Sequence, residues 1–300
     1  MSKTNNDDAA LAIEFRNVSI SFDDTAALVE ASFQLARGEM IFLTGASGSG
    51  KSVLLHLAIG LLKPDSGQIF IDGREIETLG ESELLAIRGG LMGMVFQEDS
   101  LFTGLTVYEN AAYRLEEHGW TEEEIEKAVG EVLRYVGLEN EAERLPEELS
   151  GGMKRRLEFA RALIGWPSIM LFDEATMFLD PIVAVQVLDL IMRARDINKV
   201  SSIYATKKPY EIPYLATYYA SQDAEGAIVV SEAPIDRLPR TKVLLLERGK
   251  IVFSGSVTEF QKSDLPLIKE MLTFDVHDHS ADPYFPDPWD KRRRPKDEIL

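Results

Sequence analysis

Cysteine is absent from this chain of 300 residues, and histidine occurs only four times. Without cysteine there is no disulfide framework and no thiolate metal site, which suits a reducing cytoplasm. No apolar run approaches the roughly 18 residues that a membrane-spanning helix requires, and the first residues, MSKTNNDDAA, lack the basic and apolar regions of a signal peptide. We therefore expect a chain that neither spans a membrane nor is secreted.

Basic residues are outnumbered, because 50 Asp and Glu residues against 32 Lys and Arg residues give a formal net charge of -18. This balance argues against non-specific binding to nucleic acid or anionic lipid, both of which need clustered cations, and we expect no nucleic-acid partner. One basic cluster, KRRRPK at 291–296, lies in a tail rich in proline, aspartate and aromatic residues. It could contact lipid headgroups or an acidic partner, or be a solvated tail.

The apolar pattern alternates between strand-like and helix-like segments. AIEFRNVSISF and ASFQLARGEMIFLTG have strand patterns, and SGQIFIDGREI and KVLLLERGKIVFSG are typical of hairpins. GKSVLLHLAIGLL, most of 106–161 and the stretch from about 181 to 197 have helical patterns, whereas SIMLFDEA and SSIYAT are typical of buried strands. Such alternation predicts an α/β fold with a largely parallel core sheet, into which the helical block is inserted.

The segment GASGSGKS lies between a strand-like run and a helix-like run. Its glycines let backbone N–H groups curl round phosphate oxygens at a helix N-terminus, where the dipole also favours anions. Lys51 can reach the β- and γ-phosphates, and Ser52 can ligate Mg²⁺. A glycine-rich turn is often only a turn, but this spacing in this context predicts a P-loop. Its nucleotide-binding residues are Gly45, Ala46, Ser47, Gly48, Ser49, Gly50, Lys51 and Ser52.

A second set of candidate residues ends the apolar run IMLFDEA. Asp173, at the carboxyl end of this strand, can hold Mg²⁺ through water, and Glu174 can polarise an attacking water. An Asp-Glu pair after an apolar strand is usually only a strand end. Together with a P-loop, the pair predicts a catalytic site.

The segment ELSGGMKRRLEFARAL predicts a second anion site. Ser150 caps a helix, and Gly151 and Gly152 expose backbone N–H groups in its first turn, where two glycines would otherwise only weaken a helix. One nucleotide cannot use this site and the P-loop together if they lie in separate subdomains. A second protomer solves the geometry if each chain presents its LSGG to the γ-phosphate bound by the other.

These motifs, in this order, resemble those of ATP-binding cassette (ABC) ATPases over residues 13 to 260. The resemblance implies a P-loop NTPase fold with a RecA-like parallel-sheet core, an N-terminal antiparallel β subdomain and an α-helical insertion, using ATP and Mg²⁺. It assigns Phe22 to adenine stacking, although an aromatic residue there could simply be core. It assigns Gln97 to the link between the γ-phosphate and Mg²⁺ site and the helical subdomain, and Asp180 to contact with the partner protomer.

A narrower resemblance lies in the inserted block. FQEDSLFTGLTVYENAAYRLEEHG followed by LSGGMKRR is similar to the Mla/Mce-type ATPases of bacterial phospholipid transport, which favour Met and a following Lys/Arg pair after the glycines. Part of the first stretch is shared with importers of amino acids and other solutes, so that alternative stays open. The tail DPYFPDPWDKRRR, which could hook a neighbouring protomer, adds weaker support.

Two positions depart from the ABC pattern. Ala175 replaces the usual proline after the Asp-Glu pair, which loosens a turn without removing a functional group. Lys207, in SSIYATKKPYEI, stands where the family has its switch histidine, with Lys208 where an acid often follows. If the strand end is where the pattern places it, Lys207 is a catalytic-site residue; if it is shifted, Lys207 never approaches the nucleotide.

We therefore expect an ATPase subunit on the cytoplasmic face of the inner membrane that dimerises on MgATP and powers a separate permease, with phospholipid as the preferred cargo. The expected boundaries are a flexible N-terminus at 1–10, the ATPase domain at 11–262 with its helical subdomain at about 98–160, and an extension at 263–300. A lipid-binding substrate protein or a small STAS-type regulatory subunit could join it.

Three rival hypotheses remain: an ATPase for solute import, a nucleotide-binding module with little hydrolysis, and a soluble cassette of DNA repair or translation, which the single short cassette disfavours. A permease helix should dock near Gln97 and 100–113, where we expect four exposed apolar residues: Leu101, Phe102, Leu105 and Tyr108. The alternative is that these residues pack the insertion onto the core.

Overall fold

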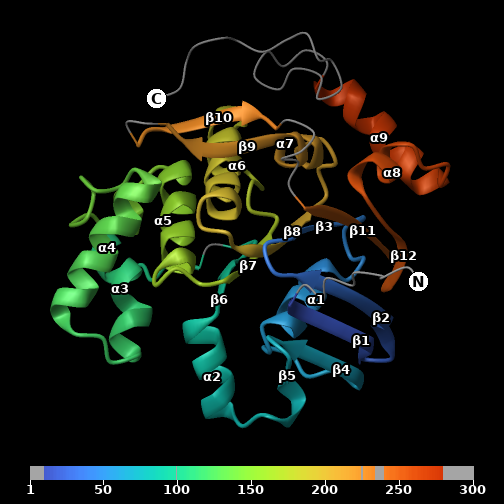
Figure 1. Cartoon of the computed structure of the whole chain (residues 1–300), viewed down its shortest axis with the longest axis horizontal. Helices are drawn as coiled ribbons and strands as arrows, with labels where there is room; N and C mark the ends of the chain where they lie inside the picture. The colour runs from blue at the N-terminus through green and yellow to red at the C-terminus, as the bar shows by residue number, and fades with distance from the viewer. Residues whose placement is uncertain (1–9, 99, 224–225, 234–239, 280–300) are drawn as a thin grey trace, which may run out of the picture.

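The computed structural model describes residues 10–98, 100–223, 226–233 and 240–279. Its central sheet has the strand order β12-β11-β3-β8-β7-β6 within those residues (Figure 1). The pairs β11–β3, β3–β8, β8–β7 and β7–β6 are parallel, and only β12 pairs antiparallel, with β11. The strand bounds are β3 Met40–Thr44, β6 Met92–Val95, β7 Ile169–Asp173, β8 Ser201–Thr206, β11 Thr241–Glu247 and β12 Lys250–Gly255.

The central strands are buried on both faces, as expected when elements cover both sides of a parallel sheet. All residues of β3, β7 and β8 are buried. Because successive side chains of a strand point to opposite faces, Met40 and Phe42 join one apolar core and Ile41 and Leu43 the other. The sheet is therefore the wall between two cores and a rigid base for residues at its edge.

The second core lies between the central sheet and an antiparallel sheet of order β2-β1-β4-β5. Its strands are β1 Leu11–Phe22, β2 Thr25–Ala36, β4 Ser66–Ile71 and β5 Arg74–Glu75. The predicted hairpin turn lies between β4 and β5, where Asp72 (φ 50°) and Gly73 (φ 76°) are both left-handed. Helix α1, Lys51–Ala58, packs between the two sheets (Figure 1).

The inserted helical block is α3 Val107–Glu117, α4 Glu122–Val136 and α5 Gly151–Leu163, which pack on one another. Figure 1 shows them on the opposite side of the molecule from the N-terminal sheet. Thr121 and Glu124 form the capping box that the sequence predicts, with Glu124 N donating to Thr121 Oγ1 and Thr121 N to Glu124 Oε2. The remaining longer helices are α2 Glu81–Gly90, α6 Pro181–Asp196 and α9 Pro266–His279.

Several elements were not predicted. α7 Glu211–Thr217 leads into a hairpin, β9 Tyr218–Gln222 and β10 Ile228–Glu232, and β9 packs on α6 (Figure 1). α8 Val257–Gln261 follows β12. Residues 1–9 and 280–300, and with them the basic cluster at 291–296, lie outside the described residues. Among the helices that are described, none has the length and hydropathy of a membrane span.

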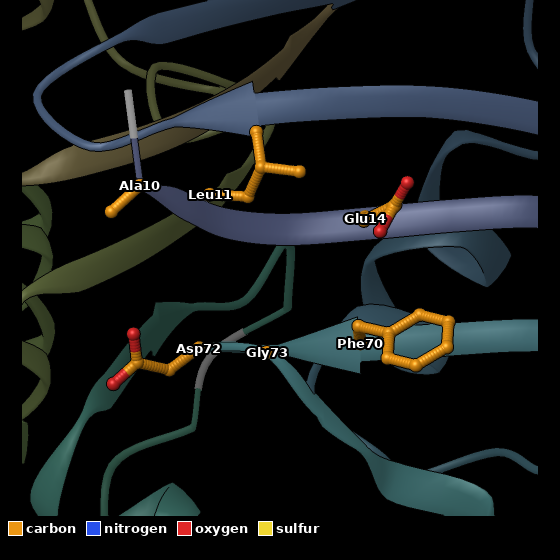
Figure 2. A pocket seen from close by; sticks show the side chains of 6 residues that line it. All are labelled: Ala10, Leu11, Glu14, Phe70, Asp72 and Gly73. Carbon is orange, nitrogen blue, oxygen red and sulfur yellow. The ribbon is translucent and has the colours of Figure 1, made fainter. Parts of the chain in front are cut away.

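A small hollow of about 210 Å³ opens beside the start of β1 and the turn after β4 (Figure 2). Its lining contains none of the predicted site residues. The residues around it are Ala10, Leu11, Glu14, Phe70, Asp72 and Gly73.

Candidate nucleotide site

The P-loop joins the end of β3 to the start of α1, and its backbone demands glycine. Gly45, Gly48 and Gly50 have φ values of 147°, 75° and 106°, in the region that favours glycine. A Cβ on Gly45 would lie 2.2 Å from Leu246 O, and one on Gly50 would lie 2.5 Å from Ala27 O. The loop is therefore tightly held against its neighbours with its N–H groups at the start of α1, as an anion site requires.

Lys51 is the buried cation of this loop. Its side chain is 5% exposed, and Nζ donates to Gly45 O at 2.8 Å and to Ala46 O at 3.2 Å. Burial lowers the pKa of Lys51, and the nearby Glu174 and Asp173 carboxylates oppose that shift. The ammonium is thus desolvated in advance, which strengthens its attraction for an incoming phosphate.

Asp173 ends β7 and is buried, and burial raises its pKa against the opposing hydrogen bond from Ser52. Its Oδ1 is buried without a hydrogen-bond partner. Such an orphaned oxygen beside a serine hydroxyl fits a hard divalent cation. Among the described residues no three His, Asp or Glu side chains are arranged to hold a metal ion, so Mg²⁺ bound by Asp173 and Ser52 would complete its oxygen ligands with phosphate and water.

Glu174 lies between two lysines. Its Oε1 is 3.7 Å from Lys51 Nζ, and its Oε2 is 3.1 Å from Lys207 Nζ. The strand register explains the second contact: Asp173 pairs with Ala205 in parallel β7 and β8, so the residues that follow each strand emerge side by side. β8 ends at Thr206, which makes the alternative of a shifted strand end wrong.

Gln97 and Lys207 converge on Met177. Gln97 Nε2 donates to Met177 Sδ at 3.3 Å, and Lys207 Nζ lies 3.6 Å from the same sulfur. The Gln97 amide therefore faces the turn after Glu174, and its predicted contact with Mg²⁺ stays a prediction. Ala175, at the position where the resemblance leads us to expect proline, is fully buried in this turn.

The remaining predicted residues lie on other elements. Ser150 caps α5, accepting from Met153 N at 3.3 Å, and Asp180 caps α6, accepting from Val183 N at 3.1 Å. A Cβ on Gly152 would lie 2.7 Å from a Val183 methyl group, so this glycine also permits α5 to approach α6. Phe22, at the end of β1, is 45% exposed and thus open to a stacking partner.

Glu211 is a residue of this region that the sequence did not reveal. Its side chain is fully buried, and its Oε2 accepts from Tyr204 OH and Thr206 Oγ1, both at 2.7 Å. Its Oε1 accepts from Thr176 Oγ1 and lies 3.8 Å from Lys208 Nζ. Thr206 and Lys208 flank Lys207, and Thr176 follows the Glu174 turn, so Glu211 ties together the two segments that carry Lys207 and Glu174.

The four apolar residues expected at the permease-docking segment differ in exposure. Phe102 is 38% exposed and packs against Tyr113 with the two rings tilted and their centroids 4.6 Å apart, and the guanidinium of Arg161 lies over the Phe102 ring. Leu105 and Tyr108 are half-buried. The expectation was wrong for Leu101, which is buried in the helical core because it anchors the segment onto that core.

Comparison with known proteins settles the class. A family model described as "ABC transporter" matches residues 28–177, half of the chain, including the P-loop and the Asp173–Glu174 pair. The chain belongs to the ABC transporter family. This ABC ATPase uses ATP with Mg²⁺, and ATP hydrolysis is coupled to transport. Relatives of this ABC ATPase dimerise and pair with a membrane permease.

Two relatives are 37% identical to this ABC ATPase. The methionine import ATP-binding protein MetN of Leifsonia xyli aligns over 83% of this chain and 67% of its own. The Arabidopsis thaliana protein TRIGALACTOSYLDIACYLGLYCEROL 3, chloroplastic, aligns over 89% of this chain and 74% of its own. Methionine import recurs among the relatives, as the solute-import alternative anticipated, and the comparisons do not single out the Mla/Mce-type group.

The predicted fold is confirmed by solved structures of other cassettes. A dimeric, post-hydrolysis state of the ATP-binding cassette MJ0796, bound to ADP and Pi, superimposes with a TM-score of 0.68. The two chains are 25% identical, and the match covers 82% of this chain and 98% of MJ0796. The P-loop NTPase class is therefore established for this chain.

Proposed function

We propose that the residues gathered around Lys51 form the hydrolytic site of this ABC ATPase. Gly45–Ser52 holds the phosphates through backbone N–H groups, and the buried Lys51 ammonium neutralises their charge. Asp173, Ser52 and Gln97 would hold Mg²⁺, which would offset negative charge on the phosphates. Glu174 orients and polarises the attacking water. The position of Glu174, which follows the end of its strand and lies within 3.7 Å of Lys51, supports this assignment.

Lys207 takes the place of the switch histidine in this proposal. A histidine can both accept and donate a hydrogen bond, whereas an ammonium can only donate. Lys207 neutralises γ-phosphate charge but provides no acceptor that would position the water. Slow ATP hydrolysis follows from that difference.

The complete site needs two protomers. Ser150, Gly151 and Gly152 offer their helix N-terminus to the γ-phosphate bound by the partner protomer, and Asp180 contacts that protomer. Phe22 stacks on adenine, which its exposed ring permits. In this proposal the permease docks at the exposed Phe102–Tyr113 pair, and the subunit works at the cytoplasmic face of the inner membrane.

We further propose that the cargo is a lipid. One observation carries this: at equal identity, the relative named for trigalactosyldiacylglycerol, a lipid, aligns over more of both chains than the Leifsonia methionine importer. The sequence GGMKRR at the start of α5, which resembles the phospholipid group, also supports it. Import of a small solute is the second candidate, favoured by the several relatives named for methionine import.

Purification with the co-purifying membrane subunits, followed by reconstitution into vesicles, tests this proposal. Transfer of a fluorescent phospholipid that requires ATP and is lost in the Glu174→Gln variant is expected. Methionine uptake with the same dependence, and no lipid transfer, would replace the lipid proposal by the solute proposal. Mass spectrometry of lipid bound to the purified complex provides a second, independent reading.

A further inference from the structure

Helix α5 carries a buried ion pair one turn after its N-terminal glycines. Arg155 Nη1 lies 2.7 Å from Glu158 Oε2, and both side chains are more than nine-tenths buried. Removing two charges from water costs several kcal/mol per ion, and well-packed apolar residues often stabilise a fold equally well. Stability alone is therefore a weak reason for this pair.

The pair holds the backbone on both sides of Gln97. Arg155 Nη1 donates to Phe96 O at 2.8 Å, and its Nη2 donates to Gln97 O at 3.3 Å. Glu158 Oε1 accepts from Ser100 N at 3.0 Å. Arg161, which follows this pair on α5, donates to Ser100 O. We call Phe96, Gln97 and Ser100 the Gln97 segment.

The chemistry of the contacts makes this connection rigid. A guanidinium is a planar fork of donors, so Arg155 bonds two successive carbonyls and one carboxylate without rotating. Bonds with an ionised partner are roughly twice as strong as neutral ones. The helix that begins at Ser150 and the backbone that carries Gln97 are thus joined by charge-assisted contacts from two buried side chains.

We propose that Arg155 and Glu158 are positioning residues that make α5 and the Gln97 segment one rigid unit. Gln97 is then placed by the same helix that offers Ser150–Gly152 to the partner protomer. Gln97 therefore approaches the nucleotide of its own chain when Ser150–Gly152 approach the nucleotide of the partner protomer. This inference rests on the proposed role of Gln97 in hydrolysis. Neither positioning residue contacts the reacting atoms.

The decisive variant is Arg155→Met/Glu158→Met, which removes both charges and keeps similar volumes. Its Tm should fall only modestly, because apolar packing replaces the ion pair while Phe96 O, Gln97 O and Ser100 N lose their side-chain partners. The kcat for ATP should fall roughly 10-fold, as is typical when an outer partner of a metal ligand is lost. The KM for ATP should change little, because the P-loop is untouched. The matched control is Arg156→Met: Arg156, on the same helix, bonds Val136 O and Gly137 O instead.

A double-mutant cycle with Gln97→Ala separates positioning from a merely structural role. If the pair acts through Gln97, Arg155→Met/Glu158→Met should lower kcat little further in a chain that already carries Gln97→Ala. The control Arg156→Met should have the same effect on kcat whether residue 97 is glutamine or alanine. The proposal would be overturned if the kcat losses from Gln97→Ala and from Arg155→Met/Glu158→Met multiplied in the combined variant. It would also be overturned if Arg155→Met/Glu158→Met alone left kcat unchanged. Should Gln97→Ala alone leave turnover intact while Glu174→Gln abolishes it, the role of Gln97 fails and this proposal fails with it, although the rest of the proposed site stands.

Discussion

Lys207 Nζ lies 3.1 Å from Oε2 of Glu174, the carboxylate proposed to polarise water. On its other side the same carboxylate lies 3.7 Å from Lys51. A histidine at 207 could accept a hydrogen bond as well as donate one, but an ammonium beside Glu174 only donates and competes with water for the carboxylate. This geometry leads us to expect an ATPase that binds normally and turns over slowly.

Replacing Lys207 tests that expectation. Lys207→His should raise steady-state ATP turnover about 10- to 100-fold, because general acid–base help is typically worth 10²–10⁴-fold. The ATP dissociation constant should change little. Lys207→Ala should weaken ATP binding, since γ-phosphate charge loses a cation. Turnover by phosphate release and binding by calorimetry are the measurements.

If both substitutions leave hydrolysis and binding unchanged, Lys207 does not act at the nucleotide. Lys242→Ala is the control, because Lys242 pairs with Glu39 at the start of β3 and holds no predicted role.

Lys51→Ala should abolish MgATP binding or weaken it strongly. A charge-assisted hydrogen bond is worth about 1.5–3 kcal/mol, so loss of one bond raises the dissociation constant roughly 10- to 150-fold. Binding of a fluorescent ATP analogue measures it. An unchanged dissociation constant with an intact fold would show that phosphates bind elsewhere.

Asp173→Asn should stabilise the nucleotide-free protein while destroying activity. Burial raises the folded-state pKa of Asp173 above its ordinary 3.8, so the folded state binds the extra proton and stability falls as pH rises through that interval. At neutral pH the ionised, buried carboxylate is therefore a cost that asparagine removes. Each 1 kcal/mol so gained corresponds to roughly 2–4 °C in Tm for a large domain.

The stabilisation should be seen in EDTA at pH 7 and vanish well below pH 3.8, and MgATP should no longer raise the Tm of the variant. Asp23→Asn, at an exposed turn, is the control. A Tm that drops at neutral pH would mean that the ionised Asp173 carboxylate stabilises the folded state, which is the opposite of the expected effect.

A photo-crosslinking residue at Phe102 should capture the co-purified membrane subunit, because this exposed ring marks the proposed docking surface. Trp120, 42% exposed in the turn between α3 and α4, provides a matched aromatic control that should not cross-link. Equal capture at both positions, or failure at Phe102 and Tyr113 alike, would count against docking here. Gel shift and mass spectrometry identify the product.

Local chemistry explains which parts could be predicted. The P-loop was predictable because its glycines and Lys51 act within eight consecutive residues. The contact of Lys207 with Glu174 was not predicted, because it depends on the parallel register of β7 and β8, which brings the two strand ends side by side. Glu211 was not predictable, because a glutamate opening a short helix gains its role only when Tyr204, Thr206 and Thr176 surround it. The role of the Arg155–Glu158 pair was also not predictable from the sequence, because its partners are backbone atoms nearly 60 residues away in the chain.

The apolar pattern of the sequence did not predict which residues of 100–113 are buried, and it did not predict the β9–β10 hairpin. Leu101 and Phe102 are neighbours of similar hydrophobicity, yet one anchors the helical core and the other is open to solvent. The β9–β10 hairpin escaped notice because its mixed aromatic and small residues, YYASQ, carry a weak alternation. Its packing on α6 supplies the missing burial.

Phosphate release by the full-length chain, compared with its Glu174→Gln variant at saturating MgATP, is the sharpest test of the proposed hydrolytic site. We predict slow but measurable release from the unaltered chain, and none above background from the variant, which should still bind ATP and accumulate as an ATP-bound dimer. Equal release from both would contradict the assignment of Glu174 and, with it, the proposed chemistry of the site.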